Sequence, residues 1–334
     1  MKKIIIPLLV AALTATAFTG CAKTPGGAAS GQTPLVLNEV AHSIFYAPQY
    51  AAIELGYFED EGIDLTLVNG AGADKVMTAL ISGDAQIGFM GSEASIYVYQ
   101  EGSQDYAVNF AQLTQRAGNF LVGRQPEDNF KWESLKGKKV LGGRAAGMPQ
   151  MVFEYILKKH GLDPKTDLDI DQSINFGLTA AAFTSNDADY TVEFEPFATT
   201  LESEGAGTVV ASLGTESGYV PYTAYSARKS YIEKNPEVIQ SFVNAIQKGM
   251  DYVNSHSAEE IAKTIQPQFK ETPVDKIATI VGRYKEQDTW KDNTIFEKVS
   301  FELLENILEE AGELSARVPY EDLVTTRFSV EAAE

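Results

Sequence analysis

Between residues 35 and 115, short apolar runs alternate with stretches of helical periodicity. The predicted strands are Leu35–Leu37, Ile63–Val68 and Gln86–Met90; the second of them alternates apolar and polar residues with a period of two. A helix is predicted from Pro48 to Gly56, and another carries Val76, Leu80 and Ile81 before Gly83. Strands and helices that alternate in this way predict an α/β fold, with a parallel sheet covered by helices on both faces.

The same pattern restarts in the middle of the chain. Lys139–Gly143 is predicted to be a strand that leads into a glycine-rich turn, and Pro149 opens a helix that ends before Gly161. Tyr190–Phe194 is a further predicted strand. The sequence therefore predicts two successive α/β lobes, joined near residues 109–118.

The last hundred residues have the pattern of helices. Asn235-Pro236-Glu237 combines an N-cap residue, a proline in the first turn and an acidic residue behind it. Further helices are predicted to start at Ser257, at Thr272, and at Asp292 or Thr294, and the last of them ends at Gly312. A helical C-terminal region is expected.

The N-terminus carries a targeting signal. Two lysines precede an apolar run from Ile4 to Ala17, which is shorter than the roughly 20 residues of a membrane span and is typical of a secretory signal peptide. Phe18-Thr19-Gly20-Cys21 resembles a bacterial lipobox, so residues 1–20 are predicted to be removed and Cys21 to carry lipid. Residues 21–34 are small and polar and are predicted to form a flexible tether. The predicted location is the extracytoplasmic face of the cell membrane.

Composition narrows the possible partners. Cys21 is the only cysteine, so once it is lipidated no thiol remains for a disulfide, a metal site or a redox centre. The chain has 46 acidic and 27 basic residues, a net charge of −19. Nucleic-acid binding needs Lys and Arg at the phosphates, so it is not expected, and neither is flat binding to anionic lipid.

Several motifs in order carry a family resemblance. They are Tyr46–Ala52 with Leu55–Ile63, Lys75–Gly91, Leu135–Val140, Glu195-Pro196 and Asn235–Glu237. They resemble the bacterial solute-binding lipoproteins of ABC importers, in the branch that binds nitrate, sulfonates, taurine or thiamin pyrimidine precursors, and the likeness covers about residues 35–255.

This resemblance implies the periplasmic binding protein type II fold, with two doubly wound α/β lobes joined by two hinge strands. Lobe 1 would comprise residues 35–115 and 222–334, and lobe 2 residues 116–221. A monomer would close about its hinges on one small-molecule ligand, without a cofactor, and deliver it to a permease driven by a cytoplasmic ATPase.

Ligands of open α/β sheets bind beyond the carboxyl ends of the strands, where helices begin. Four loops meet this rule, and each has a purely structural alternative: core packing, a tight turn, a helix cap or a surface ion pair. The candidate residues in them are His42, Ser43, Phe45 and Tyr46; Asn69, Gly70, Ala71 and Gly72; Gly91, Ser92 and Glu93; and Arg144 and Gly147.

The hinges and one strand add further candidates. Glu193 and Glu195 alternate along a strand and are expected to face the same side, while Gln112 and Gln115 lie on the first hinge and Tyr222 on the second. Aromatic residues outnumber charges in these segments. They favour a flat, weakly charged, pyrimidine-like ligand over a bare inorganic anion, although an arginine such as Arg144 suits an anion.

Other functions are less well supported by the residues. Fungal-type pyrimidine synthases resemble this family but carry a cysteine-rich stretch that this chain lacks, and no Gly-x-Ser-x-Gly motif is present. The three histidines are far apart in the sequence, and zinc needs three or four clustered ligands. A transport receptor without enzymatic activity or bound metal is therefore predicted; the alternatives are an enzyme on the same fold and a ferric-ion receptor using Tyr219, Tyr222 and Tyr225.

Overall fold

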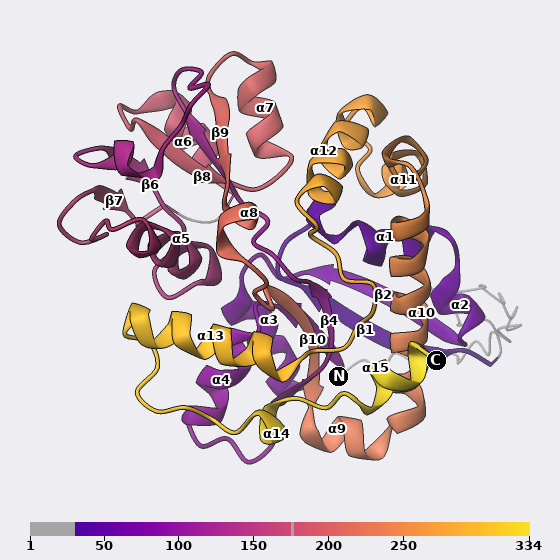
Figure 1. The fold of residues 1–334 in the computed structure, drawn as a ribbon. Coiled ribbons are helices and arrows are strands. Elements are labelled where there is room, and N and C mark those ends of the chain that lie inside the picture. The colour runs from indigo at the N-terminus through magenta and orange to yellow at the C-terminus, as the bar shows by residue number, and fades with distance from the viewer. Residues whose placement is uncertain (1–30, 175–176) are drawn as a thin grey trace, which may run out of the picture.

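The computed structural model describes residues 31–174 and 177–334. Two five-stranded sheets, each packed between helices, form two α/β lobes that lie side by side (Figure 1). This confirms the predicted fold class. The predicted signal peptide and Cys21 lie outside the described residues. The first strand begins at Thr33, two residues before its predicted start at Leu35, so it includes the last two residues of the predicted tether.

The first sheet has the order β2-β1-β3-β10-β4. Its strands are β1 (Thr33–Glu39), β2 (Ile63–Asn69), β3 (Ile87–Met90), β4 (Ala107–Thr114) and β10 (Thr223–Arg228). β1 is parallel to β2 and β3, but β10 is antiparallel to both of its neighbours. The prediction of a parallel sheet is therefore wrong for β10, because this strand enters from the other lobe.

The second sheet has the order β7-β6-β8-β5-β9. Its strands are β5 (Phe120–Gly123), β6 (Lys139–Leu141), β7 (Asp169–Asp171), β8 (Tyr190–Glu193) and β9 (Thr208–Ser212). β6 is parallel to β7 and β8, whereas β5 is antiparallel to β8 and β9. This sheet is mixed for the same reason, since β5 is the strand by which the chain enters the lobe.

Two segments connect the sheets. Residues 115–119 lead from β4 to β5, and helix α8 (Leu213–Ser217) with residues 218–222 leads from β9 back to β10. The segments run together, since the Val220 amide donates a hydrogen bond to the Gln115 carbonyl at 2.9 Å. They are the two hinge connections of the fold.

The helices near the N-terminal strands match the apolar pattern. They are η1 (Ile44–Tyr46), α1 (Ala47–Glu54), α2 (Tyr57–Asp60), α3 (Ala73–Ser82) and α4 (Glu93–Gln100). α1 has Pro48 in its first turn and α3 ends at Gly83, whose φ of 89° is the left-handed value that favours glycine at this cap. The helices of the second sheet are η2 (Trp132–Leu135), α5 (Met148–Lys159), α6 (Thr179–Ser185) and α7 (Phe197–Ser203), besides α8.

The C-terminal region is helical, as predicted. It comprises α9 (Lys229–Lys234), α10 (Pro236–Ser255), α11 (Ala258–Ile265), η3 (Gln266–Gln268), α12 (Val274–Glu286), α13 (Lys298–Ala311), α14 (Tyr320–Leu323) and α15 (Arg327–Ala332). α13 begins later than predicted, since the predicted start at Thr294 is bound to β4 through its carbonyl, which accepts from the Gln112 amide at 2.8 Å. Figure 1 shows α13 reaching beneath the second lobe, where it packs against α5.

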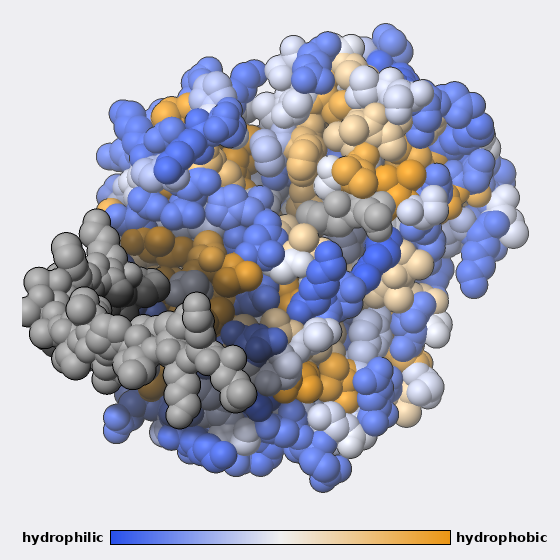
Figure 2. All heavy atoms as spheres, turned by 180° about the vertical axis from the view of Figure 1, so that it is seen from behind, coloured by the Kyte–Doolittle hydropathy of each residue, from blue (hydrophilic) through white to orange (hydrophobic). Residues whose placement is uncertain are grey.

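Apolar side chains of both lobes form a continuous buried core. On the rear face, hydrophilic residues dominate the periphery and hydrophobic residues gather toward the middle (Figure 2). Among the described helices, none combines the length and the apolar character that crossing a bilayer would require.

Candidate functional site

A cavity of about 350 Å³ lies between the two lobes. Its walls come from the loops that follow β1, β2 and β3 on one side, from the β6–α5 loop and the end of β8 on the other, and from the start of β10. Eight predicted site residues line it: Tyr46, Ala71, Gly72, Gly91, Glu93, Arg144, Gly147 and Tyr222. The rule that ligand sites follow the carboxyl ends of strands thus locates one side of this cavity.

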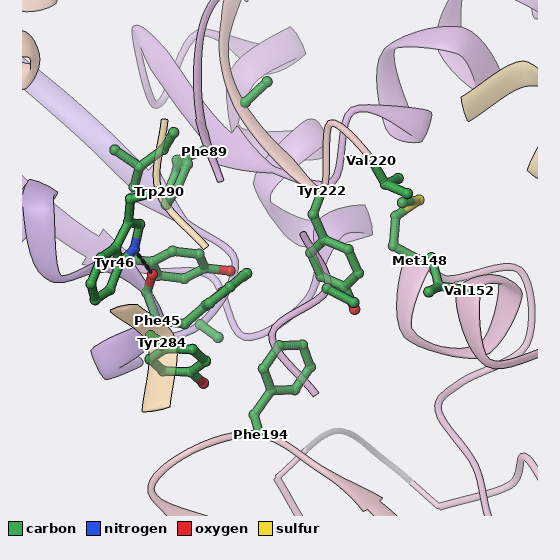
Figure 3. Close-up of a cluster of buried hydrophobic side chains, with 14 of the residues drawn as sticks. Phe45, Tyr46, Phe89, Met148, Val152, Phe194, Val220, Tyr222, Tyr284 and Trp290 are labelled. Carbon is green, nitrogen blue, oxygen red and sulfur yellow. Dashed lines mark hydrogen bonds between the residues drawn. The ribbon is translucent and has the colours of Figure 1, made fainter. Parts of the chain in front are cut away.

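Aromatic rings form one wall of the cavity. Tyr46 packs edge-on against Phe89 with ring centroids 4.5 Å apart, and Phe194 lies 6.2 Å from Tyr222 (Figure 3). Phe45 is fully buried behind them, and its carbonyl accepts a hydrogen bond from the Trp290 indole at 2.8 Å. Phe45 therefore packs in the core, while Tyr46 and Tyr222 border the cavity.

Glu93 supplies a buried carboxyl group to this cavity. It is the first residue of α4 and is only 4% exposed. Burial raises its pKa from 4.5 to about 7, although the backbone amides of Glu93 and Met148 and the charge of Arg144 act in the opposite direction. A Cβ at Gly91 would lie 2.1 Å from Glu93 Oε2, so only glycine at position 91 accommodates this carboxyl orientation.

Arg144 lines the cavity and contacts the opposite lobe. Its guanidinium donates to Asp74 Oδ1 at 3.1 Å, which joins the β6–α5 loop to the start of α3. Both side chains are more than half exposed, at 51% and 59%. Solvent screens such a pair, so it is a weak contact between the lobes.

Glu193 borders a smaller neighbouring space of about 30 Å³, which shares Arg144, Pro149 and Phe194 with the main cavity. Its carboxylate accepts hydrogen bonds from Thr179 at 2.9 Å and Thr191 at 2.6 Å. Burial raises its pKa to about 7, and the two threonine hydroxyls oppose this rise. The polar requirements of Glu193 are thus met within the protein.

Glu195 has a different environment from Glu193. β8 ends at Glu193, so the alternation of the strand does not continue, and the Glu195 carboxylate instead binds Arg283 at 2.9 Å and the Thr199 amide at 2.9 Å. Ser43 donates to the Glu195 carbonyl at 2.8 Å. Neither Ser43 nor Glu195 lines the cavity; both join α12 and η1 to the second lobe.

Three predicted residues of lobe 1 are engaged in local structure. His42 bridges Glu39, at 2.7 Å, and the Gln268 carbonyl, at 2.9 Å. Burial opposes protonation, but the contacts with Glu39 and the Gln268 carbonyl together outweigh it and raise the His42 pKa. Asn69 caps its own turn by accepting from the Ala71 amide, and Gly70 packs closely against Asn38.

Protein groups also bind Ser92, from the third predicted loop, and the predicted hinge residues Gln112 and Gln115. Ser92 donates to the Pro221 carbonyl, Gln112 to the Thr114 carbonyl at 2.9 Å, and Gln115 to the Asp288 carbonyl at 3.2 Å. These contacts hold the connections between the lobes. None of the three lines the cavity.

The tyrosines of the ferric-ion alternative do not converge. Their hydroxyls donate to separate groups: Tyr219 to Asp288, Tyr222 to Asn119 and Tyr225 to Gln49. Within the part of the chain that the structure describes, no cluster of three or more His, Cys, Asp or Glu side chains is arranged to hold a metal.

Some cavity residues were not predicted from the sequence. They are Val40, Ala41, Ala73, Asp74, Lys75, Met148, Pro149, Phe194 and Thr223. Most directly follow a predicted residue in the chain, so extending each loop into the first turn of its helix would have found Asp74, Lys75 and Met148. Phe194 lies between two predicted glutamates, and nothing in the strand pattern marks the point at which the strand ends.

Comparison with known proteins identifies the family. A family model described as "NMT1/THI5 like" matches residues 44–260. The chain belongs to the NMT1/THI5-like family. Among its relatives in this family, "Putative binding protein YtlA" of Bacillus subtilis (strain 168) is 45% identical over 297 residues, which are 89% of each chain. A fungal relative named 4-amino-5-hydroxymethyl-2-methylpyrimidine phosphate synthase THI11, from Saccharomyces cerevisiae, is 23% identical over 63% of each chain.

Solved structures share the fold of this NMT1/THI5-like protein. The nitrate-binding protein NrtA of Synechocystis PCC 6803 superposes with a TM-score of 0.74 at 15% identity, covering 90% of this chain and 88% of that one. The alkanesulfonate-binding protein SsuA of Xanthomonas axonopodis, bound to MOPS, gives 0.72 at 13% identity and covers 89% and 100%. The chain therefore has the two-lobed fold of these two binding proteins.

Proposed function

We propose that this protein is an extracytoplasmic lipoprotein that captures one small solute by hinge closure and delivers it to an ABC permease. The observation that carries the proposal is the interlobe cavity, because its volume of about 350 Å³ suits a small molecule and its walls come from both lobes. The solute is a pyrimidine-type vitamin precursor or an anion of the alkanesulfonate or nitrate kind.

Closure follows from the way the lobes are connected. In our proposal lobe 1 comprises residues 35–115 and 222–334, lobe 2 comprises 116–221, and the two connections bend together. The weak Arg144–Asp74 bridge supports this motion, since exposed ion pairs contribute at most about 1 kcal/mol and are readily broken. A ligand held by both lobes would favour the closed state by its extra contacts there.

The proposal also includes a lipid anchor, which keeps the protein next to its permease. Cys21 carries lipid on the outer face of the cytoplasmic membrane, residues 21–34 link it to the lobes, and the protein acts as a monomer. We expect Cys21→Ala to move the protein from the membrane pellet to the soluble fraction, as judged by immunoblot, with Ser30→Ala as the control. A mutant that stays in the pellet would contradict the anchor.

An enzyme on the same fold is the alternative, supported by the fungal synthases at 21–23% identity. The 45%-identical relative is instead named as a binding protein, and this chain's only cysteine lies in the lipobox. We therefore favour binding without turnover.

Ligand binding tests the proposal directly. A thermal-shift screen of pyrimidines, alkanesulfonates and nitrate, followed by calorimetry and solution scattering, should give a 1:1 complex that is more compact than the free protein. A ligand at a hundred times its Kd should stabilise the fold by about 2.7 kcal/mol. Conversion of the ligand to product, or a scattering profile that no solute changes, would contradict the proposal.

A further inference from the structure

The buried glutamates of this protein differ in whether protein groups pair with their carboxylate oxygens. Five glutamates are buried among the described residues: Glu39, Glu93, Glu193, Glu195 and Glu305. Four of them are satisfied by protein groups. Glu39 accepts from Gln49 and Tyr50, each at 2.8 Å, and Glu305 from the Val318 amide at 2.8 Å, while Glu193 and Glu195 bind the threonines and Arg283 described above.

Glu93 is the exception. Within the described part of the chain, its Oε2 atom is buried and has no hydrogen-bond partner, and the residue lines the interlobe cavity. Buried polar atoms in folded proteins are nearly always paired, and an unpaired one weakens the fold. An unpaired acceptor beside an open cavity is free to accept a hydrogen bond from a donor group that occupies the cavity.

We propose that Glu93 binds an N–H donor of the solute, so that the cleft selects a nitrogen-bearing ring, with an amino group or a protonated ring nitrogen, over an oxyanion. This inference rests on the proposed function and narrows its ligand class. Once Glu93 is ionised, a sulfonate or nitrate at this position would bring a second negative charge against a desolvated carboxylate.

The surroundings of Glu93 agree with a ring as the ligand. Tyr46, Phe194 and Tyr222 line the same cavity and offer faces and edges to a flat molecule. The charged groups that line it are Asp74, Lys75 and Arg144, and Arg144 is already paired with Asp74. The titratable side chains that interact electrostatically with Glu93 are Tyr46, Tyr97, Tyr222 and Arg144.

The test uses matched ligands and matched variants of the full-length mature protein. The ligand pair is 4-aminopyrimidine and pyrimidine, which differ only in the donor group, and ethanesulfonate and nitrate represent oxyanions. The variants are Glu93→Gln and, as the control, Glu193→Gln, a second buried glutamate whose oxygens are already hydrogen-bonded. Calorimetry at pH 6 and pH 8 gives each affinity.

We expect 4-aminopyrimidine to bind at least about tenfold more tightly than pyrimidine, since a hydrogen bond to a charged group is lost with the amine. Glu93→Gln should remove most of that difference and Glu193→Gln should keep it. Affinity should also rise from pH 6 to pH 8 in the wild type, because the ionised carboxylate is the better acceptor, and this rise should be absent in Glu93→Gln.

Two results would overturn the inference while leaving the proposed function intact. One is tight binding of ethanesulfonate or nitrate that Glu93→Gln leaves unchanged or strengthens. The other is equal affinity for 4-aminopyrimidine and pyrimidine in the wild type. Failure of every probe to bind or to change the scattering profile would instead count against both the inference and the proposed function.

Discussion

Charged groups join the two lobes in several places, and two of these regions are built differently. Between α12 and α7, Arg283 binds Glu195 and Glu202, with Arg283 26% exposed and the Glu195 side chain fully buried. At the cavity, the Arg144–Asp74 pair is exposed and Glu93 keeps an unpaired oxygen. The charges of the first region are paired within the protein, whereas the second region keeps one buried carboxyl oxygen without a hydrogen-bond partner.

This difference suggests that the Arg283 region stabilises the fold and that the cavity region serves ligand binding. A fully paired cluster around the buried Glu195 carboxylate holds the lobes at one edge, because breaking it leaves a buried charge without its partner. An exposed bridge and an unsatisfied carboxyl at the other edge cost little to rearrange. We therefore expect substitutions near Arg283 to change the free energy of unfolding, and substitutions at the cavity to change pH dependence and ligand affinity.

The largest effect should come from Arg283→Ala. It leaves Glu195 buried with only Thr199 as its partner, so we expect a loss of about 3–4 kcal/mol in unfolding free energy, measured by urea denaturation. Arg283→Lys keeps the charge but not the fork of donors and should lose less. If Arg283→Ala unfolded at the same urea concentration as the wild type, this cluster would not stabilise the interface.

Glu93→Gln should change how stability depends on pH. The folded-state pKa of Glu93 is raised from 4.5 to about 7, so its ionisation in the fold is unfavourable and wild-type stability falls as the pH rises through 7. With about 1.4 kcal/mol for each pH unit, the wild type should lose about 2–3 kcal/mol relative to the variant between pH 5 and pH 8. Thermal melts of both proteins across this range test it, and the surface variant Glu101→Gln should follow the wild type.

Tyr222→Phe tests a buried hydrogen bond behind the cavity wall. It removes a buried hydrogen bond of 2.6 Å from the Tyr222 hydroxyl to Asn119 and should cost about 1–2 kcal/mol. Tyr219→Phe removes a similar hydrogen bond at an exposed tyrosine and should cost less. Chemical denaturation of both would show whether burial decides the cost; equal losses would argue against it.

The smallest effect should come from Arg144→Ala. The exposed bridge to Asp74 contributes at most about 1 kcal/mol, so the melting temperature should hardly change, while solution scattering of the free protein should show a shift toward open forms. A loss as large as that of Arg283→Ala would remove the contrast between the two regions.

Local signals in the sequence predicted much of the fold and part of the cavity. Prolines at helix starts and Gly83 and Gly312 at helix ends marked α1, α3, α5, α10 and α13. The antiparallel strands were missed because strand direction depends on partners far away in the chain, and β9 has no alternation of buried and exposed residues. The unpaired oxygen of Glu93 was not predictable either, since it depends on how the β6–α5 loop and α4 meet.

The place of β10 in the first sheet has a consequence for the order of folding. β4 joins this sheet only through β10, which follows it by more than a hundred residues of intervening chain. All five strands of the second sheet, in contrast, lie within residues 120–212. As the polypeptide emerges from the ribosome or the export channel, the second lobe can therefore finish its sheet while the first still waits for its closing strand. We expect nascent chains stopped at residue 215 to protect the second lobe from protease and to leave β4 cleavable.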